Sequence, residues 1–264
     1  MNPNNIDFVL LIPCYNNLKG LTESLKSISY QFERFEVLIV DDGSKVPITR
    51  NDMPIDPSMV VHILRFDQNQ GIVTALNAGL TALKSRIDFN YIARLDAGDT
   101  CDQQRFYKQV NFLNQHKEIM LLGSWARFQH KTSAHSYDYI TKTTQEEIEK
   151  EMHYKCSFIH PSVMFRKEIL DSTGFYPDTF PHAEDYAFFW KILKQHKGAV
   201  IPEKLVQITY SDASVSAENY TRQLRSRKKI VKEFGDDWLR KRIGSVLLSL
   251  KLILPRKLIT ALKS

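Results

Sequence analysis

The stretch DFVLLIPCYNN (Asp7–Asn17) decides the fold, because an apolar run ends there in a proline and then in polar residues. A short, continuous apolar run with such a boundary is typical of a fully buried strand. Asn17 can cap a helix whose leucines follow at helical spacing. We therefore predict a strand over Asp7–Pro13 and a helix from Asn17 to about Gln31.

The same strand-then-helix pattern recurs along the first half of the chain. Apolar residues at helical spacing predict a further helix over Gly71–Leu83. Strands that alternate with helices and are apolar throughout indicate a parallel, doubly wound α/β sheet with helices on both faces. The further strands that we expect are Glu36–Val40, Met59–Phe66, Asn90–Leu95 and Ile119–Phe128.

Composition places the chain among globular proteins of a reducing compartment. Its 264 residues are 43% hydrophobic and 25% charged, which is ordinary for a globular enzyme. Cys14, Cys101 and Cys156 are scattered and show no zinc-ligand spacing. The first residues lack a basic segment, and the apolar run after them is too short for a signal peptide or a membrane span. We expect a cytoplasmic protein.

The loops that follow the predicted strands are rich in polar residues. In doubly wound sheets, ligands bind beyond the carboxyl ends of the strands. Turn preference alone explains any one such loop, since Asp, Asn and Gly favour turns. Four together favour a ligand site. They read PCYNN, DDGS, DQNQG and DAGD.

Taken with the second half, these loops resemble the inverting glycosyltransferases of family 2, which have the GT-A fold. The likeness covers about residues 7–216, so we expect a catalytic domain over 1–216 and a basic helical region over 217–264. Each motif alone is weak, but six in the family's order are specific. They are IPCYN (Ile12–Asn16), VDDGS (Val40–Ser44), NQGIVTALNAG (Asn69–Gly79), RLDAGD (Arg94–Asp99), HPSVMFRK (His160–Lys167) and HAEDYAFFWKIL (His182–Leu193).

The resemblance implies a nucleotide-sugar donor, most commonly a UDP-sugar. Pro13 and Tyr15 then line the nucleobase, and Asp42 accepts a hydrogen bond from the base, with Asp41 beside it. The other donor-binding residues implied are Asn16, Asn69, Gly71, Asn77, Arg94 and Asp96.

The RLDAGD stretch stands where the family has a carboxylate motif that holds Mg²⁺ or Mn²⁺ against the diphosphate. Gly98 occupies the place of a frequent direct ligand, so we expect Asp96 and Asp99 to hold the ion. The alternatives are a weak metal site helped by cations such as Arg94, and a plain glycine turn. A histidine that completes the site in many relatives is absent, which leaves Asp212 as a substitute.

The HAEDY stretch implies the acceptor side of the reaction. Asp185 matches the family's catalytic base, which takes the proton of the acceptor hydroxyl. Glu184, His160 and Trp190 are expected to bind the acceptor. The alternatives are that both acids only favour a helix start, and that the histidine and the aromatic residues belong to the core.

The positive charge of the protein is concentrated in its C-terminal tail. From Asn219 onward there are 13 Lys and Arg and three Asp and Glu, a net charge of +10. Because the whole chain has a net charge of +6, the residues before Asn219 carry a net charge of −4. Basic helices over Arg222–Phe234 and Trp238–Lys263 carry Leu, Ile and Trp, which favours peripheral contact with the inner face of an anionic cell membrane. The alternative is packing on the core or on a second subunit as a homodimer. No aromatic-basic module for nucleic acid is present.

These features predict an inverting, non-processive glycosyltransferase. It would add one sugar to a hydroxyl of a glycan or glycolipid in capsule, lipopolysaccharide or O-antigen synthesis. No Q-x-x-R-W motif or long apolar span of the processive synthases is present. One alternative is a sugar nucleotidyltransferase, although the stretch PCYNNLKG after the first strand does not match the Gly-rich signature of that class. The other is a catalytically weakened binding protein with the same fold.

Overall fold

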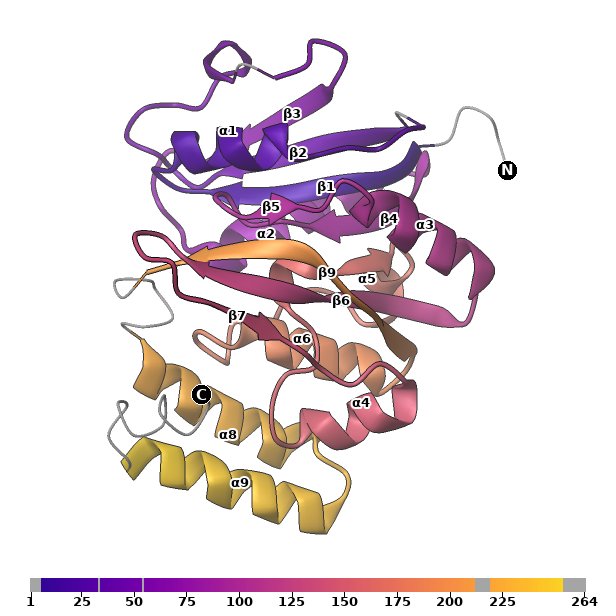
Figure 1. The fold of residues 1–264 in the computed structure, drawn as a ribbon, viewed down its shortest axis with the longest axis vertical. Helices are drawn as coiled ribbons and strands as arrows, with labels where there is room; N and C mark the ends of the chain where they lie inside the picture. Colours follow the sequence, from indigo (N-terminus) through magenta and orange to yellow (C-terminus); the bar gives the residue numbers. More distant parts are fainter. Residues whose placement is uncertain (1–5, 33, 54, 212–218, 254–264) are drawn as a thin grey trace.

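The computed structural model describes residues 6–32, 34–53, 55–211 and 219–253 (Figure 1). One curled sheet runs through the molecule in the order β3-β2-β1-β4-β8-β6-β9-β5, and β7 pairs with β6. The strands are β1 (Ile6–Cys14), β2 (Phe35–Asp41), β3 (Val60–Arg65), β4 (Phe89–Arg94), β5 (Thr100–Cys101), β6 (Ile119–His130), β7 (Ser136–Tyr139), β8 (Met164–Arg166) and β9 (Lys197–Tyr210).

The first four strands, β1 to β4, pair in parallel, as the sequence predicts. Successive side chains of β1 point to opposite faces, so Leu10 packs with helix α1 (Leu18–Lys26) and Leu11 packs with helix α2 (Ile72–Lys84). A strand that is apolar at every position is buried on both sides by this arrangement. Helix α1 ends at Lys26, five residues before the predicted end.

The second half of the sheet is mixed in direction. The short strand β8 runs antiparallel to both β4 and β6, whereas β6 and β9 are parallel to each other. The sequence predicted neither β9 nor β7. Exposed Glu and Lys side chains interrupt the apolar pattern of β9, and β7 is exposed over most of its length. The remaining elements are the 3₁₀ helices at Arg50–Asp52 and His160–Ser162 and the helices α3 (Arg105–Gln115), α4 (Gln145–Met152), α5 (Ile169–Ser172) and α6 (Glu184–Leu193).

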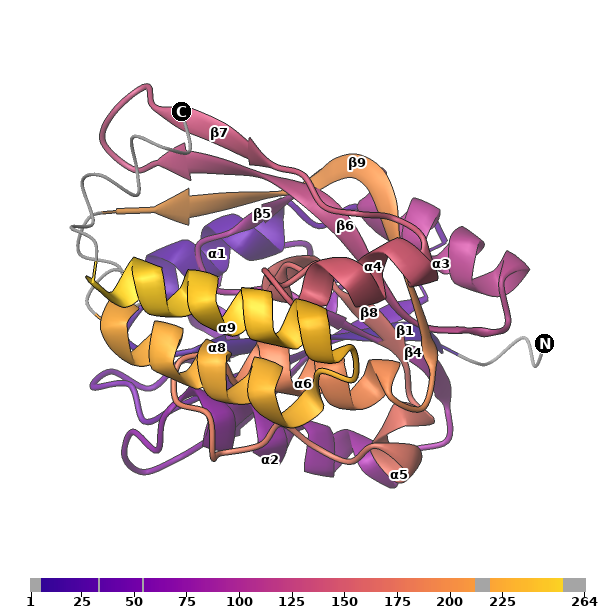
Figure 2. The ribbon, with the colours of Figure 1, turned by 90° about the horizontal axis from the view of Figure 1, so that it is seen from below.

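Two C-terminal helices, α8 (Tyr220–Phe234) and α9 (Trp238–Ile253), lie side by side at one end of the molecule (Figures 1 and 2). Leu224, Ile230 and Leu248 belong to the same apolar cluster as α6. A side chain at Gly244 would lie 2.0 Å from the carbonyl oxygen of His153, which shows how closely α9 approaches the core. Packing of the tail on the core is therefore confirmed for the inner faces of these helices.

Among the described residues, no helix is long and apolar enough to cross a membrane. The predicted domain boundary at residue 216 and the proposed substitute ligand Asp212 lie outside the described residues.

Candidate active site

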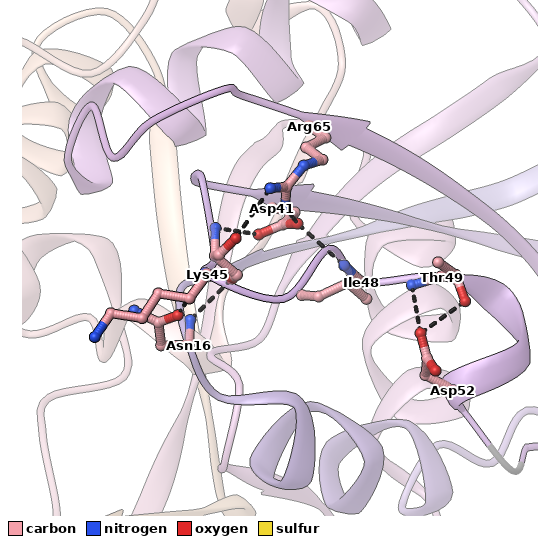
Figure 3. Close-up of polar contacts among 8 residues, drawn as sticks. Asn16, Asp41, Lys45, Ile48, Thr49, Asp52 and Arg65 are labelled. Carbon is pink, nitrogen blue, oxygen red and sulfur yellow. Dashed lines mark hydrogen bonds and ion pairs between the residues drawn. The ribbon is translucent and has the colours of Figure 1, made fainter.

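The carboxylate of Asp41 organises the loop that follows β2 (Figure 3). It is fully buried and accepts hydrogen bonds from the backbone N–H groups of Ser44 (2.9 Å) and Ile48 (3.2 Å). Arg65, at the end of β3, forms an ion pair with it. Burial acts to raise the pKa of Asp41, but these donors outweigh it and hold that pKa below its usual value. Asp41 is therefore satisfied by the protein itself and positions the loop rather than facing a nucleotide.

Asp42 joins two of the predicted ligand loops. Its two carboxylate oxygens accept the backbone N–H groups of Gln70 (2.7 Å) and Gly71 (3.0 Å), just before α2 begins. Gly43 makes this contact possible, because its φ is +70° and a side chain there would lie 2.3 Å from the backbone of Gln68. Each oxygen of Asp42 keeps a lone pair, so the carboxylate can still accept a donor from a ligand.

The loop after β1 completes this edge of the sheet. Pro13 lies in the buried end of β1, and Tyr15 beyond it is 47% exposed. Asn16 donates its backbone N–H to the Ser44 hydroxyl (2.9 Å) and accepts the N–H of Lys45 (2.9 Å) on its side chain (Figure 3). The structure thus brings the three loops together at the carboxyl ends of β1 and β2. Asn69 lies on the exposed side of the DQNQG loop.

Arg94, the last residue of β4, is fully buried, and each of its three guanidinium nitrogens donates a hydrogen bond to a protein group. It contacts the carbonyl of Leu11 (2.6 Å), the carboxylate of Asp96 (2.6 Å) and Nε2 of His160 (3.3 Å). Burial acts to raise the pKa of Asp96, but the charge of Arg94 holds it below its usual value. The prediction that Arg94 touches the donor does not fit this position: it orients Asp96, which remains 42% exposed.

Asp96 and Asp99 lie in one tight turn, in which the backbone N–H of Asp99 donates to the Asp96 carbonyl (3.0 Å). Gly98 has φ +110°, a conformation that a side chain makes costly. Asp99 accepts the N–H of Thr209 (3.1 Å) and is 6% exposed. Burial and then the charge of Asp96 raise the pKa of Asp99 to about 8. The two carboxylates therefore repel each other, and of the two only Asp96 forms an ion pair, with Arg94.

His160 and Tyr176 sit behind these acids. Nε2 of His160 accepts from Arg94 and lies 2.9 Å from the hydroxyl of Tyr176. Burial and the neighbouring Arg94 lower the pKa of His160 to about 4, so the ring is neutral. Asn77 of α2 forms two hydrogen bonds with the backbone of Tyr176 (2.9 and 3.0 Å). The predicted donor ligand Asn77 is thus committed to holding this loop.

Glu184 and Asp185 begin α6, and the structure places them beside the acidic turn. Burial raises the pKa of the Tyr176 hydroxyl, and the charges of Asp96, Asp185 and Glu184 raise it further, so the three carboxylates lie within electrostatic reach of one side chain. Glu184 is 9% exposed, and no group in the described parts of the chain hydrogen-bonds its Oε2. Burial and the charge of Asp185 raise the pKa of Glu184 to about 7.

Asp185 is partly exposed, and one of its oxygens accepts its neighbour's backbone N–H (2.7 Å). Its second oxygen has no such contact in the described residues. At the first turn of a helix, a carboxylate is favoured by the backbone dipole.

Trp190 does not reach this site. Its ring is 2% exposed and packs edge-on against His153 at 5.2 Å between centroids. Phe188 and Phe189 are fully buried as well. The prediction that Trp190 binds the acceptor therefore does not fit, and the alternative that these aromatic residues belong to the core describes their positions.

A divalent cation fits the acidic turn as a partly protein-held site. Within the described residues, no group of three or more His, Cys, Asp or Glu side chains could hold a metal. Mg²⁺-type sites commonly use one or two carboxylates and take their remaining ligands from substrate phosphates and water. The crowded pair Asp96 and Asp99 matches that chemistry, and a cation there would relieve their repulsion.

Sequence reasoning missed the residues that support this site. Arg105 of α3 is fully buried and donates to the carbonyl of Arg94 (2.7 Å). Ser24 of α1 accepts the N–H of Gly98 (2.9 Å) and donates to the carbonyl of Asp96 (3.2 Å). No motif marks these positions, because each acts through contacts between residues far apart in the sequence.

The sequence model of glycosyl transferase family 2 matches residues 9–174, which include the loops after β1, β2, β3 and β4 and end before Tyr176 and α6. The chain belongs to glycosyl transferase family 2. The resemblance seen in the sequence is thereby confirmed, as is the GT-A fold: the structure aligns with S. aureus TarS 1–349 in complex with UDP at a TM-score of 0.69, with 18% identity, covering 98% of this chain and 75% of that one.

The chain is also similar in sequence to bacterial glycosyltransferases and similar in fold to an archaeal one. It is 29% identical over 247 residues to the amylovoran biosynthesis glycosyltransferase AmsE of Erwinia amylovora, covering 86% of this chain and 88% of AmsE. It is 27% identical over 231 residues to an uncharacterised glycosyltransferase of Haemophilus influenzae, covering 85% and 84%. A mannosyltransferase of Pyrobaculum calidifontis in complex with GDP-Man and Mn²⁺ aligns at a TM-score of 0.62, with 16% identity, covering 88% and 64%.

Proposed function

We propose that the protein transfers one sugar from a nucleotide-sugar to a hydroxyl of a glycan or glycolipid in the synthesis of a bacterial surface polysaccharide, with inversion at the anomeric carbon. The observation that carries the proposal is the position of two acid pairs, Asp96–Asp99 and Glu184–Asp185, of which Asp96, Glu184 and Asp185 all act electrostatically on the buried Tyr176. One pair suits the leaving diphosphate, and the other suits the attacking hydroxyl.

The nucleotide is proposed to bind across the loops after β1, β2 and β3. Tyr15 offers an exposed ring for the base, and Asp42 offers lone pairs for a base N–H. Solved neighbours of this fold include complexes with UDP, UDP-GlcNAc and GDP-Man. A UDP-sugar is the donor that we propose.

Asp185 is the proposed general base. It stands at the start of α6 with one oxygen held by a backbone N–H and the other available. As the hydroxyl oxygen bonds to the anomeric carbon, Asp185 takes its proton and the nucleoside diphosphate leaves. A single displacement of this kind inverts the anomeric centre and needs no covalent intermediate. Glu184 is proposed to bind the acceptor, because its unpartnered Oε2 lies beside the base. His160 then holds Arg94 and Tyr176 in place rather than meeting the acceptor directly.

Mn²⁺ or Mg²⁺ is the proposed cofactor, held by Asp96 and Asp99. When bound, it would neutralise the diphosphate that departs. Arg94 keeps Asp96 ionised and aimed outward, which is what a metal-binding carboxylate requires.

The test is a set of UDP-, GDP- and dTDP-sugars incubated with the full chain, Mn²⁺ and a mixture of glycan acceptors. We expect release of a nucleoside diphosphate, a product longer by one sugar in mass spectrometry, and an inverted anomeric proton coupling in NMR. A retained configuration would overturn the mechanism. In a parallel incubation with nucleoside triphosphates and sugar 1-phosphates, formation of a nucleotide-sugar with release of pyrophosphate would instead identify a nucleotidyltransferase. Tight binding of nucleotide without turnover of any donor would identify a binding protein.

A further inference from the structure

Helix α9 carries an apolar stripe on the face that points away from the core. Its members follow one another at intervals of four, three, four and three residues, and they are between 42% and 80% exposed. The opposite face of the helix holds Gly244 and Leu248, which pack inward. An exposed row of large apolar side chains on a surface helix marks a contact surface. The stripe consists of Leu239, Ile243, Val246, Leu250 and Ile253.

A basic groove of about 460 Å³ runs beside this stripe, between α8 and α9. Its cationic walls come from both helices, and none of these cations forms an ion pair within the described residues. The one acid of the groove, Asp236, is paired with Lys194 at 3.0 Å. Ser245 adds a buried hydroxyl that lacks a hydrogen-bond partner in the described part of the chain. The four cations are Lys228, Lys232, Lys241 and Arg242.

We propose that α8 and α9 dock the protein on the surface of a bilayer that contains anionic phospholipid. The stripe enters the boundary between headgroups and acyl chains, and the groove receives a headgroup phosphate. Within residues 219–253, ten Lys and Arg face three Asp and Glu, which leaves a charge of +7 that complements such a surface. A second copy on this face would instead bring two strongly basic helices together, at a cost in repulsion.

The position of the helices fits this role. Helix α9 forms the outermost layer at its end of the molecule, with α8 beside it and α6 behind (Figures 1 and 2). Trp238 opens α9 and is 71% exposed, as tryptophans at a membrane interface are. Because α8 packs on α6 through the shared apolar cluster, docking holds the helix that bears Asp185 one helical layer from the bilayer.

The test is flotation of the full chain with phosphatidylcholine vesicles, with and without about 30% phosphatidylglycerol, a share large enough to give the surface a negative potential. We expect flotation only with the anionic vesicles. Val246→Ser/Leu250→Ser should lower the partition coefficient at least tenfold. Lys232→Gln/Lys241→Gln should lower it by about 25-fold, since each basic side chain near such a surface contributes about a factor of five.

The matched controls alter the same residue types on other faces. Val46→Ser/Ile87→Ser removes two exposed apolar side chains, and Lys19→Gln/Lys117→Gln removes two exposed lysines. Both controls should float like the parent, and all variants should keep the parent's melting temperature. An equal fall in the partition coefficient for a control and for the stripe or groove variant that it matches would overturn the proposal. So would a parent dimer that Val246→Ser/Leu250→Ser converts to monomer with unchanged flotation, since the stripe would then be a subunit interface.

Discussion

Two acidic regions of this molecule differ in whether the protein supplies hydrogen-bond and ion-pair partners for a buried carboxylate. After β2, Asp41 is buried, receives two backbone donors and one arginine, and has a lowered pKa. At the start of α6, Glu184 is almost as deeply buried, has an unpartnered oxygen, and has a pKa raised to about 7. Burying an acid without partners is costly. The first region gives its acid protein partners, and the second leaves an acid oxygen without one, which suits the substrate-binding role that we propose for it.

The two acids of the turn after β4 differ in the same way, since one has a charged partner and the other has a raised pKa. Asp96 is held by Arg94, while the pKa of Asp99 is raised to about 8 by burial and by its neighbour. Sites that carry chemistry commonly contain such perturbed groups. The contrast can be tested by mutations that should affect activity in one region and stability in the other.

Among the mutations of the acidic turn and of the buried acids, the largest effect is expected for Asp99→Asn. The amide can still accept the N–H of Thr209, so the fold should survive, but the negative charge that we assign to metal binding is lost. We expect kcat to fall on the order of 10³-fold, because a metal ion supplies several kcal/mol to such reactions. The affinity for Mn²⁺, measured by electron paramagnetic resonance, should fall as well. Asp102→Asn, an exposed acid three residues on, should leave both quantities unchanged.

Removal of the unpartnered acid should stabilise the protein. The pKa of Glu184 is raised from 4.5 to about 7, so its contribution to stability is complete below pH 4.5 and is lost as pH rises through 7. Glu184→Gln should therefore gain stability over the parent as pH increases, by up to about 3 kcal/mol above pH 8. Urea unfolding across this pH range measures it. Glu168→Gln, at an exposed site, is the control. Parallel curves for parent and Glu184→Gln would show that Glu184 is not perturbed.

At Asp41, which has hydrogen-bond and ion-pair partners in the protein, removal of a partner should destabilise the fold. Arg65→Ala leaves Asp41 buried without its ion-pair partner, and we expect a loss of about 2 kcal/mol in the free energy of unfolding. The exposed pair Arg127–Asp138 offers a comparison, in which Arg127→Ala should cost less than about 1 kcal/mol. Nucleotide affinity that falls far more than stability does would instead place Asp41 in the donor pocket.

The smallest effect is expected at the glycine of the acidic turn. Gly98→Ala should destabilise by about 1 kcal/mol, because φ is +110° there. Gly174→Ala places the same change at φ +84°, away from the acids, and should cost a similar amount. Calorimetry gives both values. Only Gly98→Ala should also weaken Mn²⁺ binding, and equal metal affinity in the two variants would separate the turn from the metal site.

The sequence predicted the first half of this fold well, because its strands are apolar throughout and its helices have regular leucine spacing. It missed β9, whose Glu203 and Lys204 hide a long strand, and β7, which is mostly exposed. The motifs picked out Asp96 and Asp185, both of which act electrostatically on Tyr176 in the structure. They could not show that Arg94 turns inward, because that depends on the carbonyl of Leu11, 83 residues away in the chain.

The central claim is that Asp185 takes the acceptor proton, and Asp185→Asn tests it most directly. We predict that kcat falls by about 10²–10⁴-fold, while the UDP dissociation constant and the melting temperature stay at parent values. Asp178→Asn, an exposed acid in the preceding loop, should behave like the parent. An Asp185→Asn enzyme that transfers sugar within a few-fold of the parent rate would contradict the account.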